Sequence, residues 1–246
     1  KGGGKVRETP FPAYKPLGEE EVKAVTEVVK SGVLSRFLGA WHEDFYGGPN
    51  VKAFESEWKE HFQVQHAISV NSASSGIIAA LGAIGICPGD EVIVTPYSMC
   101  ISATGPLFYG AVPVFADIEP DFYCLDPDSV EEKITEKTKA IIVVDLFGQP
   151  YDVDRINSLA KKHNLVVIED ASQAPQATWN GKYAGTLGDI GIYSLNYHKH
   201  IHCGEGGVVV TNNDDWAERI RLIRNHAEAA MAGREDMGDL TNMVGF

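Results

Sequence analysis

The chain has 246 residues, 44% of them hydrophobic, and a formal net charge of -13. This size and apolar content allow one large domain or two small ones with a sizeable core, and the negative charge argues against a nucleic-acid-binding surface. The four cysteines lack CxxC spacing, the first residues lack the apolar stretch of a signal peptide, and no apolar run is long enough to span a bilayer, so we expect a cytoplasmic protein that uses neither a metal site nor a membrane.

The first 62 residues are predicted to hold an arm and two helices. Residues 1–18 are rich in glycine and proline and predict an extended N-terminal arm, and we assign residues 19–246 to the folded domain. A helix is expected over residues 19–31, where valines repeat at helical spacing. After a loop rich in glycine and aromatic residues, a second helix is expected from about Val51 to Phe62, with Asn50 as a candidate N-cap.

Beyond this point, short apolar strands alternate with helices. Seven strands are expected, at residues 67–70, 91–95, 112–116, 140–145, 165–169, 190–194 and 207–211. Helices are expected between most of them, including residues 74–84, 127–135, 152–163 and 214–225. This alternation predicts an α/β fold, a mostly parallel seven-stranded sheet with helices on both faces.

The candidate functional residues follow predicted strands, at the sheet edge where parallel sheets bind ligands. Asp170 directly follows the predicted strand at residues 165–169, and Lys199 lies further along the chain in a glycine-rich turn. An acid can keep a pyridine nitrogen protonated, and a lysine can form a Schiff base, so the pair suits pyridoxal phosphate. Alternatively, Asp170 caps a helix and Lys199 is a surface lysine.

The segment after the first strand suits the phosphate of such a cofactor. It runs from Asn71 to Gly76 and opens a helix, whose N-terminus offers N–H groups at Ala73 and a hydroxyl at Ser74. An ordinary serine-capped helix would have the same sequence pattern.

Four motifs occur in one order along the chain: Leu146–Pro150, Glu169–Ala174, Ser194–Gly207 and Arg224–His226. Together they resemble the DegT/DnrJ/EryC1/StrS family of pyridoxal-phosphate-dependent aminotransferases of amino sugars and aminocyclitols, from about Phe11 to the last residue. The resemblance implies the large domain of the type I fold of these enzymes. In the family a small C-terminal domain follows, which we expect to be absent from this chain.

The resemblance also implies roles for single residues. Lys199 would carry the cofactor and transfer the proton in catalysis, Asp170 would pair with the pyridine nitrogen, and Gln173 would bond the 3-hydroxyl. Ser194 would bind the phosphate together with Ala73 and Ser74, where the family has Gly-Thr.

Several positions depart from the family pattern. Ser172 would lie against one ring face, where the family usually has alanine. Met99 would cover the other face, where the family has an aromatic residue, with Tyr97 as the alternative. The family often has histidine at Asp145 and Pro175, so a different substrate preference is expected.

By resemblance, the substrates are glutamate or glutamine as amino donor and a nucleotide-linked keto sugar or a keto-cyclitol as acceptor. A homodimer with a shared active site is expected. One reason is the apolar loop from Leu34 to Pro49, whose large side chains have no period that would bury them locally.

Three alternatives remain. A regulatory protein could bind pyridoxal phosphate or a sugar nucleotide without turnover. A pyridoxal-phosphate-dependent sugar dehydratase is disfavoured, because those relatives have histidine in place of Lys199. An oxidoreductase of the Rossmann type is disfavoured because no GxGxxG follows a strand.

Overall fold

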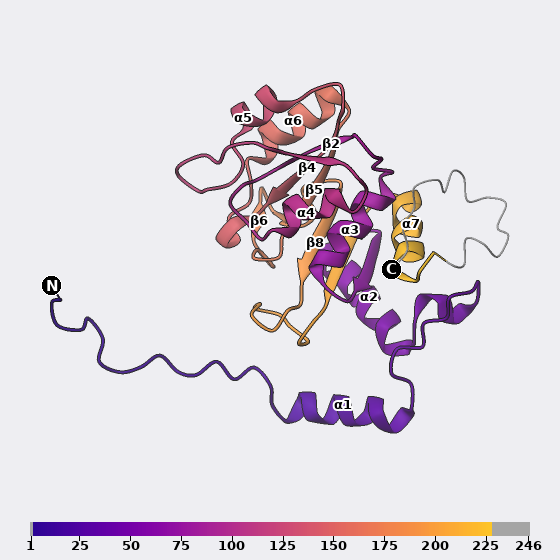
Figure 1. The fold of residues 1–246 in the computed structure, drawn as a ribbon. Coiled ribbons are helices and arrows are strands. Elements are labelled where there is room, and N and C mark those ends of the chain that lie inside the picture. The colour runs from indigo at the N-terminus through magenta and orange to yellow at the C-terminus, as the bar shows by residue number, and fades with distance from the viewer. Residues whose placement is uncertain (1, 228–246) are drawn as a thin grey trace. The chain divides into compact units, whose positions relative to one another are not determined.

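The computed structural model describes residues 2–227, which form two compact units divided after Arg36 (Figure 1). The first unit holds the helix α1 (Glu19–Ser31), with the bounds expected from its sequence. The backbone N–H of Gly18 donates to the Glu21 carboxylate at 2.6 Å, and Gly32 ends the helix in the left-handed conformation. Residues 2–18 contain neither helix nor strand.

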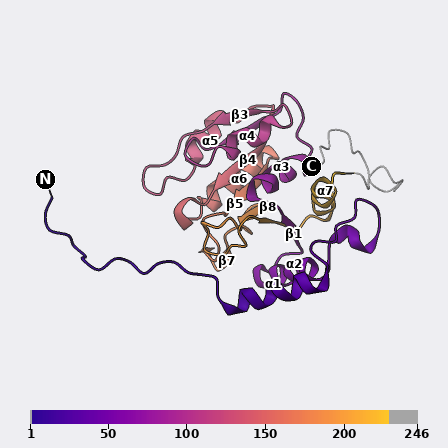
Figure 2. The ribbon, with the colours of Figure 1, turned by 60° about the horizontal axis from the view of Figure 1, so that its bottom comes forward.

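The second unit is built around a seven-stranded sheet in the order β1-β9-β8-β5-β4-β2-β3, so that β1 and β3 lie at its two ends (Figure 2). The strands are β1 (His66–Val70), β2 (Glu91–Val94), β3 (Val112–Phe115), β4 (Thr138–Val144), β5 (Val166–Asp170), β8 (Ile190–Ser194) and β9 (Gly207–Thr211). Only β9 runs antiparallel to its neighbours, β1 and β8, among the described strands of this sheet. The predicted fold class and all seven strands are confirmed.

Both faces of the sheet are buried, which explains why its strands are almost continuously apolar. Side chains alternate between the faces: Ile141 and Val143 of β4 belong to one core, and Ala140 and Ile142 to the other. The first core is covered by α2 (Pro49–Phe62), α5 (Pro127–Lys133) and α6 (Val153–His163), and the second by α3 (Ala73–Ala83) and α7 (Asp214–Arg224).

The helices correct the sequence expectations at two places. α2 begins at Pro49 and is capped by Gly48, so Asn50 lies inside the helix, because proline at the first helical position fixes the start two residues earlier than expected. The helix α4 (Ile101–Leu107) was not expected, since Gly105 and Pro106 stand near its end. A small hairpin of β6 (Thr178–Trp179) and β7 (Lys182–Tyr183) was also not expected.

The aromatic loop before α2 folds back on its own unit in part. Its 3-10 helix η1 (Glu43–Tyr46) buries Phe45 completely, against Trp41 at 4.8 Å between ring centroids. The expectation that its large side chains lack local burial is therefore wrong for Phe45, although Leu38 and Tyr46 stay exposed.

Within the described part of the chain, no helix has the length and apolar character needed to cross a membrane.

Candidate functional site

The carboxyl ends of the parallel strands surround a cavity of about 330 Å³. All eight predicted site residues line it: Ala73, Ser74, Met99, Asp170, Ser172, Gln173, Ser194 and Lys199. They come from segments up to 126 positions apart in the chain (199 minus 73), and the sheet brings them together. Ser72, Ser98, Asn196, His198 and Glu205 also line the cavity.

The N-terminus of α3 lines this cavity with Ser72, Ala73 and Ser74, and its cap leaves backbone N–H donors available. Ser72 caps the helix, and its hydroxyl accepts from the N–H of Ser75 at 3.1 Å. The cap thus does not occupy the N–H groups of Ala73 and Ser74. β9 approaches closely because Gly207 has no side chain: a Cβ there would lie 2.7 Å from the Ala73 nitrogen.

Asp170 ends β5 with its side chain almost completely buried. Its carboxylate accepts from the N–H of Ser172 at 3.0 Å. Burial raises the pKa of Asp170, whereas hydrogen bonds from Ser172 and the charge of Lys199 oppose the shift. A turn follows Asp170 instead of a helix, so the alternative that it caps a helix does not hold.

Gln173 also does not begin a helix. Its side chain links the loop after β5 to the loop after β4. Its side-chain oxygen accepts from the backbone N–H of Phe147 at 2.8 Å. Its NH₂ group is therefore the part of the amide that can donate to a ligand in the cavity.

Lys199 is half-buried on a turn that Asn196 organises. The Asn196 carbonyl accepts from the N–H of Lys199 at 2.8 Å, and the Asn196 side chain accepts from the N–H of His198 at 3.1 Å. The same side chain donates to Glu205 at 2.8 Å. The first two bonds shape the turn locally, and the bond to Glu205 joins the two sides of the glycine-rich hairpin that carries the lysine. Sequence reasoning did not identify Asn196 or Glu205.

Met99 and Tyr97, the two candidates to cover the second face of the cofactor ring, lie in different places. Met99 lines the cavity and is 68% exposed. Tyr97 does not line it, and its ring instead contacts Tyr123 and Phe147.

Asp145 and Glu169 form a buried pair of carboxyl groups, and sequence reasoning did not predict their interaction. Glu169 accepts from the N–H groups of Gly185, Leu187 and Gly188 at 2.6–2.8 Å. Asp145 is equally buried. Burial, followed by the Glu169 carboxylate, raises the pKa of Asp145 well above its ordinary value. We infer that Asp145 is the protonated member, since three N–H donors stabilise the charge on Glu169.

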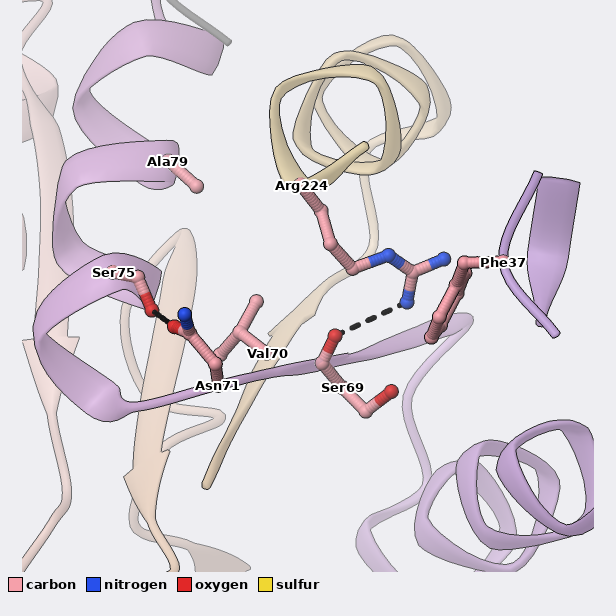
Figure 3. Close-up of a pocket in the computed structure, with 7 residues that line it drawn as sticks. All are labelled: Phe37, Ser69, Val70, Asn71, Ser75, Ala79 and Arg224. Atoms are coloured by element: carbon pink, nitrogen blue, oxygen red, sulfur yellow. Dashed lines mark hydrogen bonds between the residues drawn. The ribbon is translucent and has the colours of Figure 1, made fainter. Parts of the chain in front are cut away.

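A second cavity, of about 310 Å³, lies beside β1 and is lined by Arg224 of α7 (Figure 3). Arg224 pairs with Glu55 of α2 at 2.7 Å, donates to the Ser69 carbonyl at 3.1 Å, and stacks over Phe37 at 4.5 Å from the ring centroid. None of the predicted site residues lines this cavity, and its cation is matched by a buried carboxylate. We therefore regard this cavity as a structural contact, in which Arg224 joins α7 to α2 and β1, and not as a ligand site.

Histidine, cysteine and carboxylate side chains of the described residues form no group of three that could hold a metal ion.

Comparisons with known proteins show which family the chain resembles and which solved structures share its fold. The model of the DegT/DnrJ/EryC1/StrS aminotransferase family matches residues 15–246. The chain is 42% identical over 214 residues to a pleiotropic regulatory protein of Geobacillus stearothermophilus, covering 87% of this chain and 55% of that protein. It is 34% identical over 242 residues to an L-glutamine:2-deoxy-scyllo-inosose aminotransferase of Streptomyces lividus, with coverage of 97% and 55%.

Among solved structures, the GDP-4-keto-6-deoxy-D-mannose-3-dehydratase of E. coli, determined with hydrated pyridoxal phosphate bound, has a TM-score of 0.76 at 29% identity. The match covers 87% of this chain and 54% of that one. The chain spans about half the length of the curated relatives it matches.

Proposed function

The chain belongs to the DegT/DnrJ/EryC1/StrS aminotransferase family, and we propose that the protein carrying it is a pyridoxal-phosphate-dependent aminotransferase. It would move an amino group from glutamate or glutamine to a keto sugar or a keto-cyclitol. The observation that carries this proposal is the meeting of Lys199 and the buried Asp170 in one cavity at the carboxyl edge of the sheet.

The donors and acceptors of the cavity fit the cofactor. The start of α3 and the hydroxyls of Ser74 and Ser194 suit a phosphate. Asp170 is a buried carboxylate whose pKa is raised by burial, and a protonated ring nitrogen would supply the counter-charge that opposes this shift. Gln173 offers its NH₂ group to a ring hydroxyl.

Each residue would then have a distinct task in the reaction. Pyridoxal phosphate, when bound, supplies a ring that withdraws electrons from the substrate carbon. Lys199 would hold the cofactor covalently and, once displaced by the donor, would carry the proton as base and then acid. Asp170 would keep the ring nitrogen protonated, and α3 would fix the phosphate end so that Lys199 stays within reach.

The rival functions predict different outcomes. A regulatory protein that only binds the cofactor would not release keto acid from glutamate. A dehydratase would eliminate a hydroxyl group from its sugar; in such relatives a histidine replaces the lysine, whereas this chain has Lys199.

The test is to load the full-length protein with pyridoxal phosphate and add glutamate or glutamine. We expect the absorbance band of the lysine-bound cofactor to disappear while keto acid appears in equal amount. A band that persists, with no keto acid from either donor, would show that the protein is not an aminotransferase of this type.

A homodimer that works in the cytoplasm completes the proposal. Leu38 and Tyr46 remain exposed on the loop before α2, which supports a subunit contact there. The cysteines Cys87, Cys100, Cys124 and Cys203 are all free thiols, as is usual for a reducing compartment.

A further inference from the structure

Asn196 lies between the end of the β8–β9 pairing and the turn that carries Lys199. The strand pairing ends with Ser194 opposite Gly207. Continuing this antiparallel register by two residues puts Asn196 directly opposite Glu205, where cross-strand side chains come close together. The Asn196 side chain donates to the Glu205 carboxylate at 2.8 Å, and both residues line the cavity of Lys199.

The Asn196 side chain uses its oxygen and its NH₂ group for two different tasks. The oxygen accepts from the N–H of His198 at 3.1 Å, which bends the chain immediately before Lys199. The NH₂ group holds Glu205 on the other side of the hairpin. Aspartate in this place could accept from His198 but could not donate to Glu205, because an ionised carboxylate is an acceptor only. The contact thus depends on one donor and one acceptor placed across the hairpin.

The backbone of Asn196 contacts the two residues proposed to hold opposite ends of the cofactor. Its N–H donates to the Ser194 hydroxyl oxygen at 3.3 Å. This bond uses an acceptor position of the hydroxyl, so the Ser194 O–H can still donate to a phosphate. The Asn196 C=O accepts from the N–H of Lys199 at 2.8 Å. The orientation of Asn196 therefore affects both anchors.

The bond between Asn196 and Glu205 should matter more for geometry than for stability. Glu205 is exposed and Asn196 is only partly buried, so water can replace either partner when the bond is lost. A reacting group that is displaced by about 1 Å can lose about a hundredfold in rate. Removing the bond should therefore lower the rate while the protein stays folded.

We propose that Asn196 and Glu205 are positioning residues for Lys199. Their bond fixes the hairpin so that the Lys199 side chain reaches the cofactor and, once displaced, the carbon between which and the cofactor it carries the proton. The inference rests on the proposed aminotransferase function and adds two residues to it, both of which act through Lys199. The charge of Glu205 is not required, because a neutral amide oxygen also accepts from Asn196.

Four variants of the full-length protein remove or exchange the donor and the acceptor. Asn196→Asp removes the donor, Glu205→Ala removes the acceptor, and Glu205→Gln keeps an acceptor without the charge. The double variant Asn196→Asp/Glu205→Gln exchanges the two groups, so that the introduced glutamine donates to the introduced aspartate. Glu131→Ala is the matched control, because Glu131 also makes an exposed bond, with Lys162 at 2.8 Å, and does not line the cavity.

The first readout is hydrogen–deuterium exchange of the cofactor-free protein. We expect Asn196→Asp and Glu205→Ala to speed up exchange at the backbone N–H of Lys199 about three- to tenfold, the effect of one lost hydrogen bond. Glu205→Gln, the double variant and Glu131→Ala should exchange as the unsubstituted protein does. This readout needs neither cofactor nor turnover, so it tests the hairpin contact independently of the proposed function.

The second readout is the rate at which saturating amino donor removes the absorbance band of the lysine-bound cofactor. Asn196→Asp and Glu205→Ala should lower this rate about ten- to hundredfold, because Lys199 is displaced. The donor concentration that gives half the maximal rate should change by less than about twofold, because donor binding is not altered. The double variant should restore the rate to within about threefold of the unsubstituted protein.

The double variant decides between positioning and other roles. The inference is overturned if the double variant restores neither readout, or if the single substitutions change exchange but leave the rate unchanged. A rate that falls equally in Glu205→Gln and Glu205→Ala would mean that the charge of Glu205 acts directly, and it would also overturn the inference.

Uptake of the cofactor separates these outcomes from failure of the proposed function. Absorbance and mass spectrometry show first whether Lys199 carries pyridoxal phosphate. If the loaded protein releases keto acid but its rate does not respond to the variants, only the positioning role fails. If the unsubstituted protein takes up no cofactor, the proposed function fails, and the positioning role with it.

Discussion

Asp170 is a buried acid whose protonation should affect stability and catalysis in opposite directions. Its pKa is raised by burial. For an acid with a raised folded-state pKa, the stabilising contribution is present below the unfolded pKa and is lost as the pH rises through the folded one. In the cofactor-free protein, Asp170→Asn should therefore stabilise the fold above that folded pKa and have little effect at strongly acidic pH.

The same substitution should lower turnover of the loaded enzyme about a hundredfold or more, because an amide cannot keep the ring nitrogen protonated. Urea unfolding at acidic and mildly alkaline pH measures the first effect, and keto-acid release measures the second. A stability gain equal at both pH values would contradict the burial argument, and normal turnover would mean that Asp170 is only structural.

Asp145 and Glu169 offer a second test at the residue scale. Asp145→Asn should be nearly neutral for stability at neutral pH, because the replaced group is already uncharged and its oxygen can still accept from Tyr151, which donates at 3.1 Å. Glu169→Gln should cost about 1–3 kcal/mol, because one oxygen that accepts backbone N–H bonds becomes a donor. Denaturant unfolding of both variants decides this, and the reverse order of stability would mean that Asp145 carries the charge.

The site residues could be predicted to different extents for a physical reason. Lys199 and Asp170 are recognisable because each lies in a compact local motif. Glu169 stands in one of those motifs, but its role depends on N–H groups at positions 185–188, which only the tertiary fold brings to it. Asn196 likewise acquires its role from the hairpin that closes over it.

At the scale of elements, Arg224 joins α7 to α2 and to β1. Arg224 and Glu55 have side chains only 8% and 12% exposed, so removing one partner leaves a buried charge. Glu55→Ala should destabilise the protein by about 3 kcal/mol. Arg155→Ala, which breaks the exposed pair with Asp128, is the control and should leave the unfolding midpoint unchanged. If the two substitutions shifted the urea unfolding midpoint equally, the proposed role of Arg224 and Glu55 in joining these elements would be contradicted.

The elements themselves could be predicted where their pattern is local. The bounds of α1 follow from its acidic first turn and from Gly32 beyond its end. α4 escaped prediction because it is short and contains glycine and proline, and it persists because Ser102, Gly105 and Pro106 are buried against the fold. Tertiary packing outweighs propensity there.

At the scale of the whole molecule, the seven strands could be read from apolar runs, but their order could not. β9 inserts between β1 and β8 and runs against both, which depends on pairing between distant segments. A local pattern reports only whether a segment is buried on both faces.

The proposed homodimer with a shared site is tested by light scattering on the full-length protein and by subunit mixing. We expect a dimer, and we expect activity to recover when an inactive Lys199→Ala protein is mixed with an inactive variant of the loop before α2, because hybrid dimers regain one intact site. A fully active monomer would rule this arrangement out.

The measurement that bears most directly on the whole account is borohydride reduction of the pyridoxal-phosphate-loaded protein, followed by peptide mass mapping. We expect the pyridoxyl group on the peptide that contains Lys199, and no label in Lys199→Ala protein treated in the same way. Label on a different lysine, or label that survives in the Lys199→Ala variant, would contradict the assignment of this cavity as the active site.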